Sequence, residues 1–249
     1  GLGDVYKRQN QPDQDTRPMQ DLEFIILGSG TSAGVPVIAC ACDVCRSDDP
    51  RDRRTRTSAC IRFTDADGQQ RVILIDTSPD LREQALRHDL FRCDAIVYTH
   101  NHVDHTFGLD DVRRFNAVMR APIDVFAEER TMESLYRVYG HIFDRENNVN
   151  DSFVATLIPH ILDPDRPLDL FGLRLSPMRF LHGRLPILGY RVEALDEAGR
   201  VADEQPAPLP IAWCTDVSAI PPETWPAFGG LRTLVPVSYT HLRAHETAT

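Results

Sequence analysis

The stretch Thr99-His100-Asn101-His102-Val103-Asp104-His105 places three histidines and one aspartate within six consecutive positions. Imidazole nitrogens and carboxylate oxygens are the ligands that zinc and similar divalent metals prefer in proteins. A single histidine is usually structural or solvated, so the competing interpretation of this stretch is a polar loop. Four ligand-type side chains this close together favour a metal site instead.

The residues before this motif predict how its ligands are presented. Residues 94–98 (Asp-Ala-Ile-Val-Tyr) form a short apolar run that is typical of a buried strand. Side chains two positions apart on an extended backbone share a face, so His100 and His102 leave the strand end together. Asp104 and His105 follow in the turn before a helix predicted from residue 108. The motif therefore offers ligands in two directions, as a pair of neighbouring metal ions requires.

The spacing His100-x-His102-x-Asp104-His105 resembles the signature of the metallo-β-lactamase fold hydrolases. This resemblance implies an α/β fold, namely an αβ/βα sandwich of two β-sheets flanked by helices. In that superfamily, the first two histidines and a later histidine hold one metal. The motif's last two residues, a bridging aspartate and a final histidine hold the second.

Two later residues match the superfamily's pattern of ligands at strand ends. His182 follows a strand predicted over residues 173–180, and Asp216 follows the apolar run Ile211-Ala-Trp-Cys-Thr. The resemblance therefore implies His182 and Asp216 as further metal ligands. A lone histidine after a strand would otherwise be interpreted as structural.

A second cluster of ligand-type residues is Cys40-Ala-Cys42-Asp-Val-Cys45. Three thiolates at this spacing suit a structural zinc site that lacks one of its usual four ligands. The alternative is a disulfide with one thiol left over, which the total of six cysteines permits. We favour the metal site, because a chain of this length does not need a disulfide framework. The start of the chain also has no secretory signal pattern.

The cysteine triplet, Gly28-Ser-Gly-Thr-Ser-Ala-Gly-Val-Pro36, residues 48–56 and the histidine motif together resemble one branch of the superfamily. This branch is the phosphoribosyl cyclic phosphate phosphodiesterases that accompany carbon–phosphorus lyase, and the similarity runs from about Leu22 to about Val235. In the complete protein it implies two catalytic Zn²⁺ ions and one structural Zn²⁺ that a C-terminal histidine completes. Mn²⁺ or Fe²⁺ would also suit the histidine and aspartate ligands.

The expected activity is hydrolysis of a small phosphodiester, with a cyclic ribose phosphate as substrate, by a metal-bound hydroxide. Asp104 would bind a metal and orient the attacking water. Another hydrolase of the same fold, acting on a lactone, a thioester or RNA, would use the same ligands. A non-catalytic metal-binding relative also stays open, because a fold does not determine a function.

The charge balance of the chain limits its partners. With 27 basic and 37 acidic residues, the formal net charge of −10 argues against general nucleic-acid binding. Residues 46–56 contain five arginines among several aspartates. This segment is either a solvated charged loop or a rim that attracts an anionic phosphate substrate. No apolar run reaches the roughly 18 residues of a membrane span, so we expect no membrane association.

The 249 residues suit one domain. Residues 1–9 and 237–249 lack strand or helix periodicity and resemble translated adapter DNA, so we predict that both are non-native. Residues 10–21 would be a flexible lead-in, and residues 22–236 a metallo-hydrolase domain truncated at its C-terminus. His241 and His245 are not assigned as ligands, because their spacing differs from that of the family. We expect a cytoplasmic protein, and a homodimer stays open.

Overall fold

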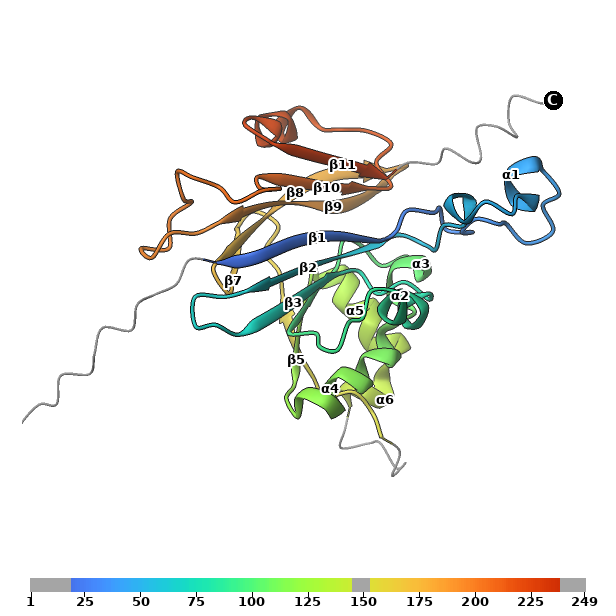
Figure 1. Cartoon of the computed structure of the whole chain (residues 1–249), viewed down its shortest axis with the longest axis horizontal. Helices are drawn as coiled ribbons and strands as arrows, with labels where there is room; N and C mark the ends of the chain where they lie inside the picture. The colour runs from blue at the N-terminus through green and yellow to red at the C-terminus, as the bar shows by residue number, and fades with distance from the viewer. Residues whose placement is uncertain (1–18, 145–152, 238–249) are drawn as a thin grey trace, which may run out of the picture.

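The computed structural model describes residues 19–144 and 153–237, which form two stacked β-sheets with helices against the outer face of the first (Figure 1). The first sheet has six strands in chain order. Its strands are β1 (Gln20–Gly28), β2 (Ser58–Thr64), β3 (Gln70–Ile75), β4 (Ala95–Val97), β5 (Ile123–Ala127) and β6 (Leu157–Ile161). The first three strands are antiparallel, and the strands from β3 to β6 are parallel.

The change from antiparallel to parallel pairing follows from the connections. The short turn at residues 65–69, with Gly68 at φ +75°, joins β2 to β3 as a hairpin. The later connections contain helices that return the chain to the same edge. These helices are α2 (Leu81–Arg87), α3 (Val103–Thr106), η2 (Leu109–Val112), α4 (Arg113–Met119), α5 (Glu129–Val138) and α6 (Gly140–Phe143).

The second sheet covers the other face of the first and has the strand order β11-β10-β9-β8-β7. All neighbouring strands in it are antiparallel except β10 and β11. Its strands are β7 (Leu168–Leu170), β8 (Leu173–His182), β9 (Leu185–Ala194), β10 (Ile211–Thr215) and β11 (Thr233–Val237). A 3₁₀ helix, η3 (Pro222–Phe228), packs on its outer face.

Strand β3 contributes to two hydrophobic cores, one on each face of the first sheet. Val72 and Leu74 pack toward the helices, whereas Ile73 and Ile75 pack toward the second sheet. Successive side chains of a strand point to opposite faces, and both faces of β3 are covered. The run therefore consists of apolar residues without polar alternation, as expected for a strand buried on both sides.

Two hydrogen bonds join the sheets directly at the end of β4. The backbone N–H of Leu188 in β9 donates to the Thr99 carbonyl at 3.0 Å. The Tyr190 hydroxyl donates to the Tyr98 carbonyl at 2.6 Å, and both tyrosines are fully buried. The backbone that leads into the histidine motif is thus attached to the second sheet.

The predicted fold class is confirmed, with two sheets and flanking helices. The strand predicted at residues 173–180 continues to His182, and β1 begins at Gln20, two residues before the predicted domain start. Residues 1–9 and 238–249, which include His241 and His245, lie outside the described residues. Val237, predicted to begin the non-native segment, is instead a buried residue of β11, because it pairs with Thr215 of β10. In the described ranges, none of the helices combines the length and the apolar character that crossing a membrane requires.

Gly189 in β9 tests the packing between neighbouring strands. A Cβ at this position would lie 2.5 Å from the Trp213 carbonyl oxygen and 2.6 Å from a ring carbon of Phe180. We expect Gly189→Ala to lower the free energy of unfolding by about 1–3 kcal/mol through overpacking. Gly140→Ala, whose added Cβ would meet nothing within 4 Å, is the matched control. Equal urea midpoints for the two variants would contradict the prediction.

Candidate metal centre

The first histidine of the motif has a defined tautomer. The Thr99 backbone N–H and hydroxyl both donate to the Asp76 carboxylate, each at 2.8 Å. The same hydroxyl lies 2.9 Å from Nδ1 of His100. Because the hydroxyl donates its one proton to Asp76, it can only accept a hydrogen bond from Nδ1–H of His100. The lone pair of His100 is therefore on Nε2, the nitrogen that faces the other ligand-type residues.

The helix α3 presents the rest of the motif. His102 is the residue before α3, and Asp104 and His105 lie within it. His105 is fully buried, with Nδ1 2.8 Å from Oδ2 of Asp76 and Nε2 3.1 Å from Oδ2 of Asp216. Its Nε2 is also 3.4 Å from a carboxylate oxygen of Asp104. The imidazole of His105 thus lies among three carboxylates.

The two ligands predicted from the second sheet lie beside the motif. His182 ends β8, and its ring centroid is 5.1 Å from that of His102 and 5.9 Å from that of His100. Asp216 directly follows β10, and its carboxylate is 3.7 Å from Nε2 of His100. Ser218 fixes the turn after His182, since its hydroxyl accepts from the Gly183 N–H at 2.6 Å and donates to the Leu181 carbonyl at 2.8 Å.

The ligand-type atoms form two groups that share Asp216. One group contains His100, His102 and Asp216, and the other contains Asp104, His105 and Asp216. Within each group, the ligand atoms lie within 4.8 Å of one another. His182 is outside both groups, although its ring adjoins that of His102. A carboxylate that belongs to both groups can bridge two neighbouring metal ions.

A buried nitrogen without a hydrogen-bond partner supports metal binding. Among the described residues, Nε2 of His100 is one of two buried side-chain atoms that make no hydrogen bond. A buried polar atom left unsatisfied destabilises the folded state, so such atoms are rare and need an explanation. A divalent cation held by His100 Nε2 and its neighbours supplies that explanation, and the donor set fits it.

The charge states of these residues suit the same interpretation. Burial and the positive charge of His105 lower the pKa of His100 to about 2, so its imidazole is neutral. Burial alone would raise the pKa of Asp216, but the hydrogen bond and charge of His105 lower it to about 2. Burial opposes the charge on His105, yet its carboxylate neighbours, Asp76 above all, raise its pKa well above the usual value. A proton on His105 and a divalent cation are two ways of balancing these carboxylates.

Asp76 is a site residue that the sequence analysis did not identify. It follows β3, is fully buried, and has a left-handed backbone with φ +63°. Its carboxylate accepts hydrogen bonds from His105 and from Thr99, so it orients ligand residues on both sides of the motif. Carboxylates that hold the second nitrogen of a metal-binding histidine are common in metalloproteins. An aspartate that directly follows a buried strand was the signal available in the sequence.

The cysteine triplet lies in the long loop between β1 and β2, which projects beyond the sheets and contains α1 (Asp43–Arg46) (Figure 1). The sulfur atoms of Cys40, Cys42 and Cys45 lie within 4.8 Å of one another. The Val37 backbone N–H donates to Cys45 Sγ at 3.3 Å. None of the six cysteines, all within the described ranges, forms a disulfide. The structure therefore does not contain the disulfide that the alternative interpretation predicts.

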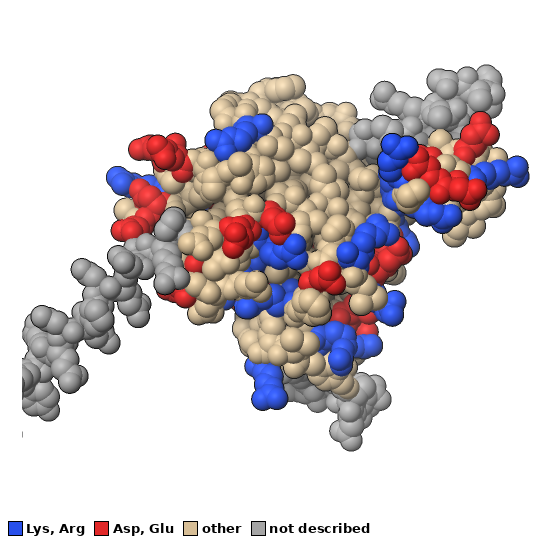
Figure 2. Space-filling model, viewed as in Figure 1, with Lys and Arg blue, Asp and Glu red and all other residues tan. Residues whose placement is uncertain are grey.

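The arginines of residues 46–56 are mixed with acidic side chains in the same projecting loop (Figure 2). Arg56 forms a two-pronged pair with Asp80, with nitrogen–oxygen distances of 2.9 and 2.7 Å. Arg51 pairs with Asp49 next to the 3₁₀ helix η1 (Pro50–Asp52). These two arginines therefore serve the structure of the loop.

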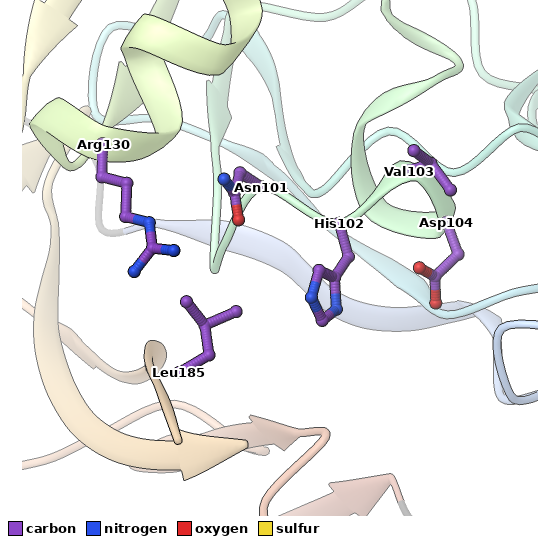
Figure 3. A pocket seen from close by; sticks show the side chains of 6 residues that line it. All are labelled: Asn101, His102, Val103, Asp104, Arg130 and Leu185. Atoms are coloured by element: carbon purple, nitrogen blue, oxygen red, sulfur yellow. The ribbon is translucent and has the colours of Figure 1, made fainter. Parts of the chain in front are cut away.

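A cavity of about 460 Å³ opens beside the motif. It is lined on one side by the motif and on the other by the start of α5 and the β8–β9 turn (Figure 3). Cavities of this size accommodate small-molecule ligands. The lining residues are Asn101, His102, Val103, Asp104, Arg130 and Leu185.

Asp76→Asn tests the orientation of His105. The asparagine amide lacks the negative charge of the carboxylate, whose oxygens accept hydrogen bonds from His105 and Thr99. We expect zinc affinity to fall about 10–100-fold, measured by competition with a chromophoric chelator. Asp169→Asn, which removes an exposed partner of Arg174, is the matched control. Equal zinc affinity in a folded Asp76→Asn variant, checked by circular dichroism, would contradict the role of Asp76.

Comparisons with known proteins agree with this geometry. The family described as the Beta-lactamase superfamily domain matches residues 71–247. A crystal structure of a new diphosphatase from the PhnP family superposes with a TM-score of 0.70 at 36% identity, covering 87% of this chain and 73% of that one. Zn²⁺-bound PqqB from Methylobacterium extorquens superposes with a TM-score of 0.59 at 21% identity, covering 86% of this chain and 69% of that one, and supports the fold.

Curated relatives match over parts of their length. An octanoyltransferase of Porphyromonas gingivalis is 44% identical over 69% of this chain, which spans 33% of that protein. Coenzyme PQQ synthesis protein B of Rhodopseudomonas palustris is 34% identical over 54% of this chain and 43% of its own length. The two sheets, the site geometry and these similarities lead to one conclusion. The chain belongs to the beta-lactamase superfamily and, within it, to the PhnP family of metallo-β-lactamase fold hydrolases.

Proposed function

We propose that this protein hydrolyses a phosphodiester, and that its substrate is a small cyclic ribose phosphate. The observation that carries the proposal is the pair of three-ligand groups sharing Asp216 beside a cavity that small molecules can enter. Similarity to a PhnP-family diphosphatase supports chemistry at phosphorus. The lactone, thioester and RNA alternatives would use the same ligand residues, and the substrate panel below distinguishes them.

The residues of the two groups would hold two divalent ions, with Zn²⁺ as the proposed metal. His100, His102 and Asp216 would hold one, next to His182, while Asp104 and His105 would hold the other with Asp216. Bound divalent ions lower the pKa of water and neutralise the charge that develops on phosphoryl oxygens. Cys40, Cys42 and Cys45 would contribute to a separate structural zinc site.

The chain's own side chains orient the reaction. Asp104 lines the cavity, and although burial opposes its ionisation, the hydrogen bond and charge of His105 lower its pKa. Its carboxylate is therefore ionised and can accept a hydrogen bond from an attacking water. Asp76 holds His105 through Nδ1, so His105 presents Nε2 toward Asp104 and Asp216. Each of these groups is in position before a substrate enters, which reduces the reorganisation that the reaction requires.

A second candidate is hydrolysis of a diphosphate. It is favoured by one observation, that the PhnP-family structure similar over 87% of this chain is that of a diphosphatase. Both reactions place an anionic phosphorus centre between the same side chains. The octanoyltransferase and the Rhodopseudomonas palustris PQQ synthesis protein B are matched over 33% and 43% of their own length. The PqqB structure, at 21% identity, supports the fold alone. We therefore propose neither of those activities.

A substrate panel tests the proposal. The purified chain should hydrolyse bis(p-nitrophenyl) phosphate and 2′,3′-cyclic AMP faster than a lactone, a thioester or ADP. Dipicolinate should abolish this activity, and added Zn²⁺ or Mn²⁺ should restore it. Preferred hydrolysis of ADP would establish the diphosphate candidate instead. Turnover of the lactone or thioester alone would contradict both phosphorus reactions, and a metal-loaded chain without any turnover would indicate a non-catalytic relative.

A matched pair of histidine variants tests the site itself. His100→Ala removes a buried ligand, and we expect kcat/KM to fall by more than the roughly 10–100-fold typical of an outer-sphere change. His160→Ala removes a partly exposed histidine that stacks on Phe126 in the first sheet, and kcat/KM should stay within about twofold. Metal content, measured by mass spectrometry, should fall in the first variant only. Equal metal content and activity in both variants would contradict the assignment.

A further inference from the structure

The helix that carries two of the ligand residues is too short to hold its own position. α3 has four residues, Val103–Thr106, and includes Asp104 and His105. The last carbonyls of a helix lack partners within the helix, and a single turn fixes several torsions for few hydrogen bonds. The placement of α3 must therefore come from contacts outside it. The carbonyls of its last two residues, His105 and Thr106, both accept hydrogen bonds from other parts of the chain.

Three buried residues surround the end of α3. The Thr77 backbone N–H donates to the His105 carbonyl at 2.8 Å, and the Thr77 hydroxyl donates to the Thr106 carbonyl at 3.3 Å. The Tyr98 hydroxyl lies 2.6 Å from the Thr77 hydroxyl. The Tyr139 hydroxyl donates to the Thr106 carbonyl at 3.0 Å. The end of α3 is therefore held by the segment that follows β3 and by the residue that follows α5.

Tyr139 makes this contact from a different part of the fold. It directly follows α5, and its ring belongs to the hydrophobic core that also contains Leu109 and Leu135. Burial and the nearby carboxylate of Asp110 raise the pKa of Tyr139 to about 12, so the hydroxyl keeps its proton at neutral pH and remains a donor. A phenylalanine ring would fill the same space in the core. What the hydroxyl adds is its hydrogen bond to the Thr106 carbonyl.

We propose that the Tyr139 hydroxyl is a positioning group for the second metal ion, the one that Asp104 and His105 would hold with Asp216. By holding the end of α3, this hydroxyl sets how far Asp104 and His105 lie from Asp216. The first two histidines of the motif precede α3, so the ligand group that contains them should not depend on Tyr139. This inference rests on the proposed function, because it takes both ligand groups to hold metal ions.

Tyr139→Phe removes the oxygen and keeps the ring. The metal-free wild type and variant are titrated with Mn²⁺, which prefers nitrogen and oxygen ligands to the thiolates of the cysteine triplet. We expect the wild type to bind two Mn²⁺ ions. In the variant the affinity for one ion should fall about tenfold or more, as the loss of an outer-sphere contact causes. The affinity for the other ion should stay within about twofold.

A second ligand variant identifies the ion that is affected. Asp104→Asn weakens the ligand group that α3 carries. In this background, Tyr139→Phe should change the affinity for the remaining ion by less than about twofold, because the two substitutions act on the same ion. A further tenfold loss in this background would place the effect of Tyr139 at the other ion and overturn the proposal.

Electron paramagnetic resonance supplies a readout that a general loss of stability would not move. Two Mn²⁺ ions that one carboxylate bridges lie close enough for magnetic coupling, and coupled and isolated ions give different spectra. At two equivalents of Mn²⁺ the wild type should show the coupled spectrum. Tyr139→Phe should show a mixture with isolated ions, which excess Mn²⁺ converts to the coupled form.

Tyr136→Phe is the matched control. Tyr136 lies on the exposed side of α5, where its ring contacts Phe143, and its variant should match the wild type in both measurements. Unchanged Mn²⁺ affinities in a folded Tyr139→Phe variant would overturn the proposal, whatever its urea midpoint, since the hydroxyl would then serve stability alone. An equal loss for both ions, or a loss in Tyr136→Phe, would also overturn it. If Tyr139→Phe does not fold, Thr77→Val, which removes the other hydroxyl on the Thr106 carbonyl, makes the same test.

Activity against bis(p-nitrophenyl) phosphate distinguishes this inference from the proposed function. If the ester is cleaved and one Mn²⁺ affinity depends on Tyr139, both stand. If no phosphodiester is cleaved while that affinity still depends on Tyr139, the proposed function fails and the positioning role stands. If the ester is cleaved and both affinities are independent of Tyr139, the positioning role fails alone. Binding of fewer than two Mn²⁺ ions to the wild type would overturn the positioning role.

Discussion

The spacing between the two sheets at the end of β4 is the constraint on which the site depends. His100, His102, Asp104 and His105 follow a strand of the first sheet, whereas His182 and Asp216 end strands of the second. Neither sheet contains a complete ligand group, because both groups include Asp216. The hydrogen bonds from Leu188 and Tyr190 to the backbone before the motif hold the two sheets together beside the ligand groups. A substitution that makes a buried side chain between the sheets smaller would therefore change the distances between the ligand groups.

Electrostatics supplies the second requirement. Four ring and carboxylate groups of the motif, together with Asp76 and Asp216, occupy a largely buried region in which isolated charges are costly. The hydrogen bonds of this region offset the cost of burying the charges, and they also orient the histidine rings. Asp76 accepts hydrogen bonds from the Thr99 hydroxyl and from Nδ1 of His105, and this leaves His100 Nε2 and His105 Nε2 facing Asp216. Positive charge is thus required at the centre of the cluster.

The sequence allowed the fold class and most of the central strands to be predicted, because their signals are local. The apolar runs at residues 94–98 and 211–215 were predicted as strands, and in the structure β4 and β10 are buried along their whole length. Strand β6 was missed because Pro159 and His160 interrupt its pattern, and Pro is tolerated there since β6 is an edge strand. The cysteine triplet predicted a candidate zinc site but not the loop that projects from the sheets. The pairing of Arg56 with Asp80 in this loop depends on the start of α2, which comes later in the chain.

The residues of the site also fall into those that local sequence signals predict and those that depend on distant neighbours. The histidine motif is contiguous, and the resemblance to a known family extended it to His182 and Asp216, which the structure places beside it. Asp76 could not be found in this way. It is a common residue type in an ordinary context, and its role depends on a neighbour that is distant in sequence. That neighbour is His105, 29 residues later.

The separation of the ligands along the chain has a consequence for how the protein matures. His105 and Asp216 are 111 residues apart, and the first sheet with its helices is encoded before any strand of the second. During synthesis the N-terminal layers can therefore collapse around the motif while Asp216 has not yet been translated. Contacts this distant form slowly. The two ligand groups are then completed late in folding, when the second sheet docks and brings Asp216 to the side chains of the motif.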